Sequence, residues 1–221
     1  MMPPESLKLR VLEAVRQQPL PRRTNRLPVT MGLAALSAVA MSAVLQWAPR
    51  LFGEVGGVAH AVGRPAASGT WILAGTVAVA LFSTWLVLPF RRSMLLPARG
   101  VLLGVAIGVP LLVGAWLVLW HTTYDDPFTR IGWRCFALTA LTAPWPFATL
   151  AYASRRMEPR HPGMAGAALG AAAGAWAAVM VELWCPLAVH SHVLVGHVLP
   201  LIVVALAGSV IGVRMFRLRR M

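Results

Sequence analysis

Charged side chains are scarce in this chain of 221 residues, where they make up 12% of the sequence and only seven are acidic. Soluble domains carry about 25% charged residues, and a globule that is 58% apolar could not hide that much apolar surface from water. The scarcity excludes an ordinary soluble domain and favours an integral membrane protein. At ~20 residues a span, the chain is long enough for about six spans with short loops.

Several familiar motifs are absent as well. The sequence has no P-loop, no dinucleotide-binding fingerprint and no zincin motif. Its apolar runs hold almost no ionisable side chains, although transporters and channels usually carry them near the membrane midplane. We therefore predict a protein that is not an enzyme, and a small transporter stays only as an alternative.

The apolar runs of bilayer length predict an all-α, polytopic membrane bundle of about six transmembrane helices with short loops. About 29 residues precede the first run, far more than the charged start of a signal peptide, so we expect the first span to remain in the mature protein. The chain then divides into a cytoplasmic tail (1–29), a transmembrane domain (30–213) and a basic C-terminal tail (214–221). The expected spans are 30–48, 70–90, 100–120, 135–153, 163–184 and 194–213.

Basic residues decide the orientation of this bundle. Six spans place both tails and the loops 91–99 and 154–162 on one side, and these segments hold sixteen of the twenty Lys and Arg residues. The positive-inside rule makes that side cytoplasmic. The formal charge of +13 therefore reflects topology and predicts contact with membrane lipid rather than direct contact with nucleic acid. Tryptophans fall at the predicted outer ends of the spans, where indole rings favour the interface: Trp47, Trp71, Trp120, Trp133 and Trp184.

Small residues recur at four-residue spacing in spans three, five and six. Such spacing lets helix backbones approach closely in lipid, which offers no hydrophobic drive for association. We expect these three spans to pack closely, and we expect kinks at the prolines inside the apolar runs. The glycines are Gly100, Gly104 and Gly108, then Gly166, Gly170 and Gly174, then Gly208 and Gly212.

Reactive side chains gather at the predicted outer ends of the spans. The chain has two cysteines, and the topology places one where span four opens and the other where span five closes. Histidines follow the second cysteine, and the one acid within a span lies just before it. The candidate sensing residues are Cys135, Cys185, His190, His192, His197 and Glu182.

Two kinds of chemistry suit this set. Thiolates and imidazoles are ligands of zinc and copper, so Cys185, His190, His192 and His197 are candidate metal ligands, although their spacing matches no standard zinc finger. His192 and His197 are also slightly too far apart for a simple i, i+4 pair on one helix face. The outer compartment permits disulfides, so the two cysteines are also a candidate redox pair. A purely structural role for these side chains stays open.

The N-terminal tail holds the one extended hydrophilic element. Within residues 5–18, apolar side chains recur at helical spacing and predict a short amphipathic helix. Such a helix either rests on anionic lipid or docks its apolar stripe in the groove of a partner. The stripe consists of Leu7, Val11, Leu12 and Val15.

Over about residues 131–213, the chain resembles the six-span bacterial anti-sigma factors of the NrsF type, among which are regulators of carotenoid genes. A cysteine opens span four, a proline interrupts it, a basic turn closes it, and a Gly-rich span ends in an aromatic–Cys pair. The residues that carry the resemblance are Cys135, Pro144 or Pro146, Arg155, Arg156, Pro162, Gly163, Trp184, Cys185, Gly208 and Gly212.

The resemblance implies a function that composition and spacing do not. In such proteins a basic N-terminal cytoplasmic segment holds an extracytoplasmic-function sigma factor, and two outward cysteines are linked to signal sensing. The histidines around His190 depart from the usual pattern of the family. The alternative is a metal- or redox-handling membrane protein that uses the outer Cys/His cluster.

Overall fold

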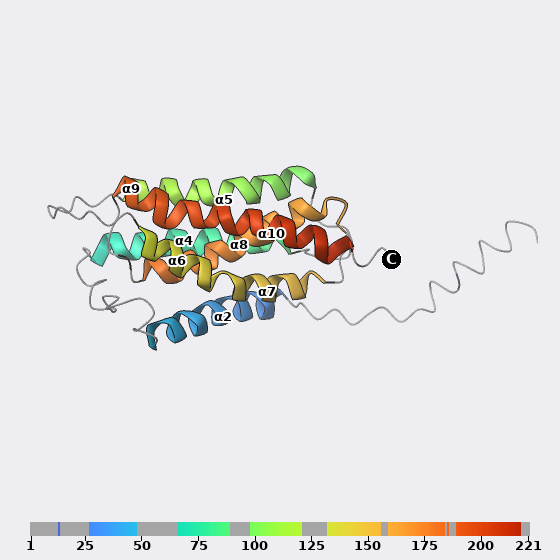
Figure 1. Cartoon of the computed structure of the whole chain (residues 1–221), viewed down its shortest axis with the longest axis horizontal. Helices are drawn as coiled ribbons and strands as arrows, with labels where there is room; N and C mark the ends of the chain where they lie inside the picture. Colours follow the sequence, from blue (N-terminus) through green and yellow to red (C-terminus); the bar gives the residue numbers. More distant parts are fainter. Residues whose placement is uncertain are drawn as a thin grey trace, which may run out of the picture.

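The computed structural model describes residues 13, 27–47, 66–88, 98–120, 132–155, 159–183, 185 and 189–217. All regular elements among them are helical, which confirms the all-α prediction. Consecutive long helices run in opposite directions, so α2 begins and α10 ends at the same end of the bundle (Figure 1). In chain order the elements are α2 (Leu27–Trp47), α4 (Ala66–Val87), α5 (Arg99–Leu119), α6 (Trp133–Thr142), α7 (Pro144–Ala153), α8 (Pro162–Glu182), α9 (His190–Val193), the π-helix η2 (Leu194–Val198) and α10 (Leu199–Arg217).

Five helical segments of the described chain are long and apolar enough to cross a membrane. They are Leu27–Val44, Gly69–Val87, Arg99–Leu119, Pro162–Glu182 and His190–Phe216. A further helical segment, the fourth in chain order, is divided between α6 and α7, which have ten residues each and meet at Ala143 (Figure 1). Pro144 causes this division, because it lacks the N–H that would continue the hydrogen bonds of α6.

The last span begins earlier than the sequence predicted. The helical segment starts at His190 instead of 194, and α9, η2 and α10 follow one another without a break to Arg217. His190 and His192, which precede the expected span, therefore belong to the helix as His197 does. The other predicted spans agree with the structure to within about four residues, the usual uncertainty of helix boundaries.

Helix α8 forms the centre of the bundle and contacts α10, α4, α5, α7, α6 and α2. Every residue from 168 to 182 is buried, and most of them are Ala or Gly. Small side chains let many neighbours approach one helix, because the backbone itself becomes the contact surface. The Gly-rich sequence of span five therefore accounts for its central position.

The predicted close packing is confirmed between α8 and α10. A Cβ atom added to Gly166 would meet the carbonyl group of Gly208, and one added to Gly212 would lie 2.7 Å from Cα of Gly166. The glycines of α5 behave differently, because a Cβ at Gly104 or Gly108 would meet nothing within 4 Å. Helix α5 instead buries Leu102, Val105, Val109 and Val113. The expected packing of α5 against α8 is present, but Gly100, Gly104 and Gly108 do not mediate it.

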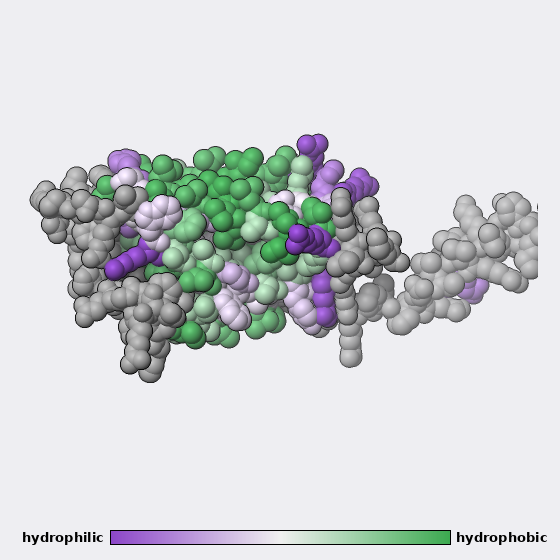
Figure 2. Space-filling model, viewed as in Figure 1, coloured by the Kyte–Doolittle hydropathy of each residue, from purple (hydrophilic) through white to green (hydrophobic). Residues whose placement is uncertain are grey.

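On the face seen in Figure 2, the described surface is apolar in the middle of the bundle and carries polar residues towards the two ends. Large apolar side chains such as Leu33, Ile107, Leu111 and Leu206 are more than half exposed. Exposed apolar surface on this scale marks contact with lipid or another protein. Among the described residues, the helix ends place Arg99, Arg155, Arg160 and Arg214 at the end where α2 begins, which we name the arginine end.

Candidate functional site

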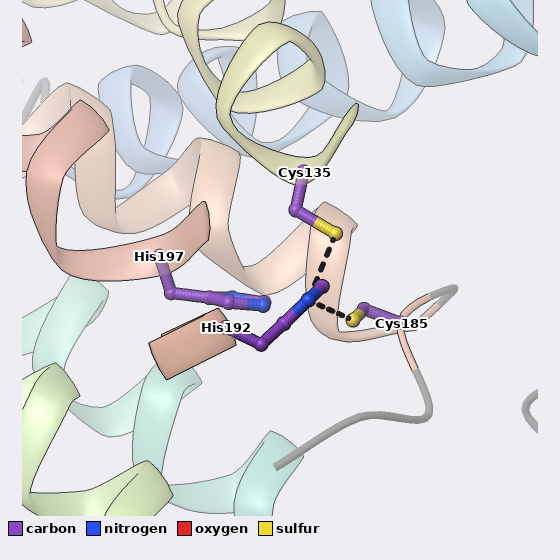
Figure 3. Close-up of side chains that lie close together, drawn as sticks. All are labelled: Cys135, Cys185, His192 and His197. Carbon is purple, nitrogen blue, oxygen red and sulfur yellow. Dashed lines mark hydrogen bonds between the residues drawn. The ribbon is translucent and has the colours of Figure 1, made fainter. Parts of the chain in front are cut away.

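Four of the predicted sensing side chains meet at the end of the bundle opposite the arginine end. Their ligand atoms, the two sulfurs and one ring nitrogen of each histidine, all lie within 4.8 Å of one another. Every member is buried. We name this group the Cys/His cluster, and it consists of Cys135, Cys185, His192 and His197 (Figure 3).

Three separate segments supply the cluster. Cys135 lies in the first turn of α6, Cys185 follows the C-terminus of α8, His192 belongs to α9 and His197 to η2. Because α6 begins, α8 ends and α9 begins at one end of the bundle, the antiparallel topology alone brings these segments together (Figure 1).

His192 lies between the two sulfur atoms. Its Nε2 atom is 3.0 Å from Sγ of Cys185 and 3.4 Å from Sγ of Cys135, and both contacts are buried hydrogen bonds. A hydrogen bond with Cys135 and burial raise the pKa of the Cys185 thiol to about 11, although contacts with His192 and His197 lower it. The thiol of Cys185 therefore keeps its proton at neutral pH unless a cation stabilises the thiolate.

His197 is held from the other side by Glu182. Its Nδ1 atom lies 2.6 Å from Oε1 of Glu182, and the two side chains are each 1% exposed. The rings of His192 and His197 have their centroids 5.4 Å apart. The acid at the end of α8 thus touches the cluster without being one of its four members.

The π-helix explains how two histidines five residues apart share one face. In η2 the backbone bonds join residues i and i+5, so a turn contains more residues than in an α-helix. The expectation that His192 and His197 are too far apart to pair rested on α-helical spacing, and the structure corrects it. Single π-turns within α-helices occur frequently at functional sites.

Two glycines that the sequence analysis did not select allow α6 to approach η2. Gly132 precedes α6 with a left-handed φ of 67°, and a Cβ there would lie 2.8 Å from the backbone nitrogen of Gly196. A Cβ on Gly196 would lie 3.1 Å from Cβ of Cys135. The isolated Gly196 in an apolar helix was the signal that could have found this contact.

The remaining candidates are placed differently. His190 begins α9 on the exposed surface and is not among the four members of the cluster, so Cys135 takes the position that the sequence analysis gave to His190 in the metal set. The stripe of the N-terminal tail lies outside the described residues: Leu7, Val11, Leu12 and Val15.

The cluster is chemically a closed set of two thiols and two imidazoles. This is a ligand combination that zinc uses in four-coordinate structural sites, so a metal ion could bind here. The same contacts bring the two thiols within reach of each other for oxidation.

The fold and the site define a bundle of apolar helices with a buried thiol–imidazole cluster at one end. A comparison with protein families finds the family described as negative regulator of sigma F over residues 14–218, and the chain belongs to this NrsF family. Membership makes the protein a negative regulator of a sigma factor, in agreement with the resemblance noted in the sequence. Neither curated proteins nor solved structures give a match.

Proposed function

We propose that this protein is a membrane-bound anti-sigma factor that sequesters an extracytoplasmic-function sigma factor and releases it on a signal from the other side of the membrane. The observation that carries the proposal is the family match over nearly the whole chain. Holding the sigma factor at the membrane keeps it from RNA polymerase by steric exclusion, and no chemical step is needed.

The arginine end is the cytoplasmic face in this proposal. Arg99, Arg155, Arg160 and Arg214 lie there, whereas Arg134 lies at the opposite end. Basic residues at the ends of spans favour the cytoplasmic side of the bacterial inner membrane. Both tails then lie in the cytoplasm, where the stripe of Leu7, Val11, Leu12 and Val15 is the proposed sigma-binding element and the basic tails contact lipid.

The Cys/His cluster, with Glu182 beside it, is the sensing element in this proposal. It lies at the end of the bundle opposite the arginine end, buried, with Cys135, Cys185 and His192 within about one turn of the ends of their helices. Its side chains suit two signals: an oxidant that joins the thiols, or a metal ion such as zinc or copper. The resemblance suggests that the sigma factor transcribes carotenoid genes. The mechanism of release does not depend on which genes these are.

The direct test is capture of the sigma factor. The detergent-solubilised protein is purified together with the sigma factor encoded beside its gene, and the two are passed through a sizing column. We expect them to elute as one complex in about equal amounts. Separate elution at micromolar concentrations of both proteins contradicts the proposal.

The Cys/His cluster also favours a second candidate, a metal- or redox-handling membrane protein. A closed buried set of ligands is useful to such a protein even without a partner. Metal binding or thiol oxidation in a preparation that never captures a sigma factor supports this candidate over the first.

A further inference from the structure

Glu182 is the one acidic residue within the described spans, and its side chain is 1% exposed. A buried carboxylate is costly unless charge or hydrogen bonds compensate it. The carboxylate contacts Nδ1 of His197, so the acid can hold the ring of this cluster member in one orientation.

We propose that Cys135, Cys185, His192 and His197 form a closed tetrahedral site for a divalent ion of the zinc class, and that Glu182 is the positioning residue that orients His197 towards it. The regulatory meaning of the site rests on the proposed function, whereas binding of the ion does not.

The distances fit such a site with little rearrangement. Bonds of 2.0–2.3 Å from a tetrahedral zinc ion put neighbouring ligand atoms roughly 3.3–3.8 Å apart. The two contacts of His192 with the sulfurs measure 3.0 and 3.4 Å, and no pair of ligand atoms exceeds 4.8 Å. A movement of about 1 Å by the most distant ligand therefore closes the coordination sphere.

The contact with Glu182 selects the nitrogen of His197 that binds. Nδ1 lies against the carboxylate of Glu182, so Nε2, a buried nitrogen without a hydrogen-bond partner among the described residues, is the atom left for the metal. The ring of His197 points towards His192 and the sulfurs, in agreement with this role (Figure 3). Metal-bound histidines commonly donate their second N–H to a carboxylate in this way.

Charge favours a divalent ion over a monovalent one. On binding, the two thiols release their protons to solvent, and two thiolates exactly compensate a dipositive ion. The carboxylate of Glu182 then leaves one negative charge, which lies against the ring of His197. A monovalent ion such as Cu(I) leaves two negative charges buried in the same place, which is costlier.

The ion joins segments that otherwise meet only by packing. It connects the start of α6 and the end of α8 to α9 and η2, which continue directly into α10. Helix α10 runs the length of the bundle to Arg214 at the arginine end (Figure 1). Occupancy of the site thus fixes the position of the helix that reaches the proposed cytoplasmic face.

The test is a titration of the purified full-length protein in detergent with Zn²⁺ alone against a competing chelator, and with Co²⁺ as a spectroscopic probe. We expect one ion per chain and the cobalt absorption bands of a tetrahedral site with sulfur ligands. Cys185→Ser and His197→Ala should lose binding. His190→Ala is the matched control and should bind as the wild type does, because His190 is exposed and outside the cluster.

The positioning role is tested separately with Glu182→Gln, which keeps the size of the side chain. We expect this variant to bind zinc about 10–100-fold more weakly and to shift the cobalt bands, and Glu182→Asp to restore part of the affinity. Wild-type affinity and an unchanged spectrum in Glu182→Gln overturn the role of Glu182. A wild-type protein that binds no zinc overturns the site, even if it captures the sigma factor. A protein that binds zinc but captures no sigma factor leaves the site in place and overturns the proposed function.

Discussion

At the scale of single residues, the position of His192 separates the two sensing mechanisms. A disulfide requires the sulfurs of Cys135 and Cys185 to bond at about 2.05 Å, which consumes both thiols that contact the ring of His192. A metal ion instead keeps the histidine between the sulfurs as a third ligand. The same four side chains therefore respond differently to substitution under the two mechanisms.

Substitutions in the cluster distinguish these mechanisms in cells. If oxidation is the signal, Cys135→Ser and Cys185→Ser should each abolish induction of the sigma-dependent genes, and His192→Ala should only alter its sensitivity. If a metal is the signal, His192→Ala and His197→Ala should abolish induction as completely as either serine variant. Reporter transcription is the measurement, and His190→Ala should induce normally in both cases. Normal induction in all cluster variants would leave the cluster a structural feature.

At the scale of elements, the approach of α6 to η2 depends on two glycines. Gly132 adopts a backbone conformation that other residues rarely take, and Gly196 leaves room for the start of α6. The contact holds Cys135 against His192, so the geometry of the cluster depends on backbone packing as much as on the ligands themselves.

Replacing Gly196 by Ala should separate α6 from η2. A Cβ at this position lies 3.0 Å from the carbonyl oxygen of Gly132, so the backbone before α6 must shift by a few tenths of an ångström, and overpacking of this kind costs about 1–3 kcal/mol. We expect a lower thermal unfolding temperature in detergent. We also expect a slower or absent response of the Cys/His cluster to an oxidant or a metal ion. Gly104→Ala is the control, because a Cβ there meets nothing within 4 Å. Equal stability of the two variants contradicts the importance of this contact.

These elements also show what the sequence could and could not predict. The spans followed from length and apolar composition, because in lipid a helix must satisfy its own backbone. The shared location of Cys135 and Cys185 followed from the topology. The contact of His192 with His197 could not be predicted, because residues five apart share one face only in a π-helix. Glycine spacing alone could not tell the buried stripe of α8 from the open stripe of α5, because both repeat every four residues.

For the whole molecule, the proposed function requires one defined orientation in the membrane. Reporter fusions after residues 25, 95, 158 and 221 should behave as cytoplasmic, and fusions near 58, 127 and 189 as exported. Alkaline phosphatase and green fluorescent protein activities measure the two cases. An exported C-terminus contradicts the six-crossing arrangement with the sigma factor at the arginine end.

The N-terminal tail is the expected point of contact with the sigma factor. Leu7→Asp or Leu12→Asp places a charge on the apolar stripe, which should weaken capture at least tenfold, on the order of 1.4 kcal/mol, and switch on the sigma-dependent genes. Ser6→Asp adds the same charge off the stripe and should leave capture unchanged. Pull-down of the sigma factor and membrane levels of each variant are measured together. Full repression by a Leu7→Asp, Leu12→Asp double variant assigns binding to the cytoplasmic loops instead.

The most direct test of the proposed function measures the release of bound sigma factor when the Cys/His cluster is perturbed. The purified complex, reconstituted in lipid nanodiscs that leave both faces open to the buffer, is exposed to zinc, to a chelator or to a mild oxidant, and the sigma factor released is quantified. We expect at least one of these treatments to release the sigma factor from the wild-type protein. We expect no release from a variant that lacks both cysteines, His192 and His197 but still captures the sigma factor. Equal release from both proteins, or from neither, contradicts the claim that the cluster controls the hold on the sigma factor.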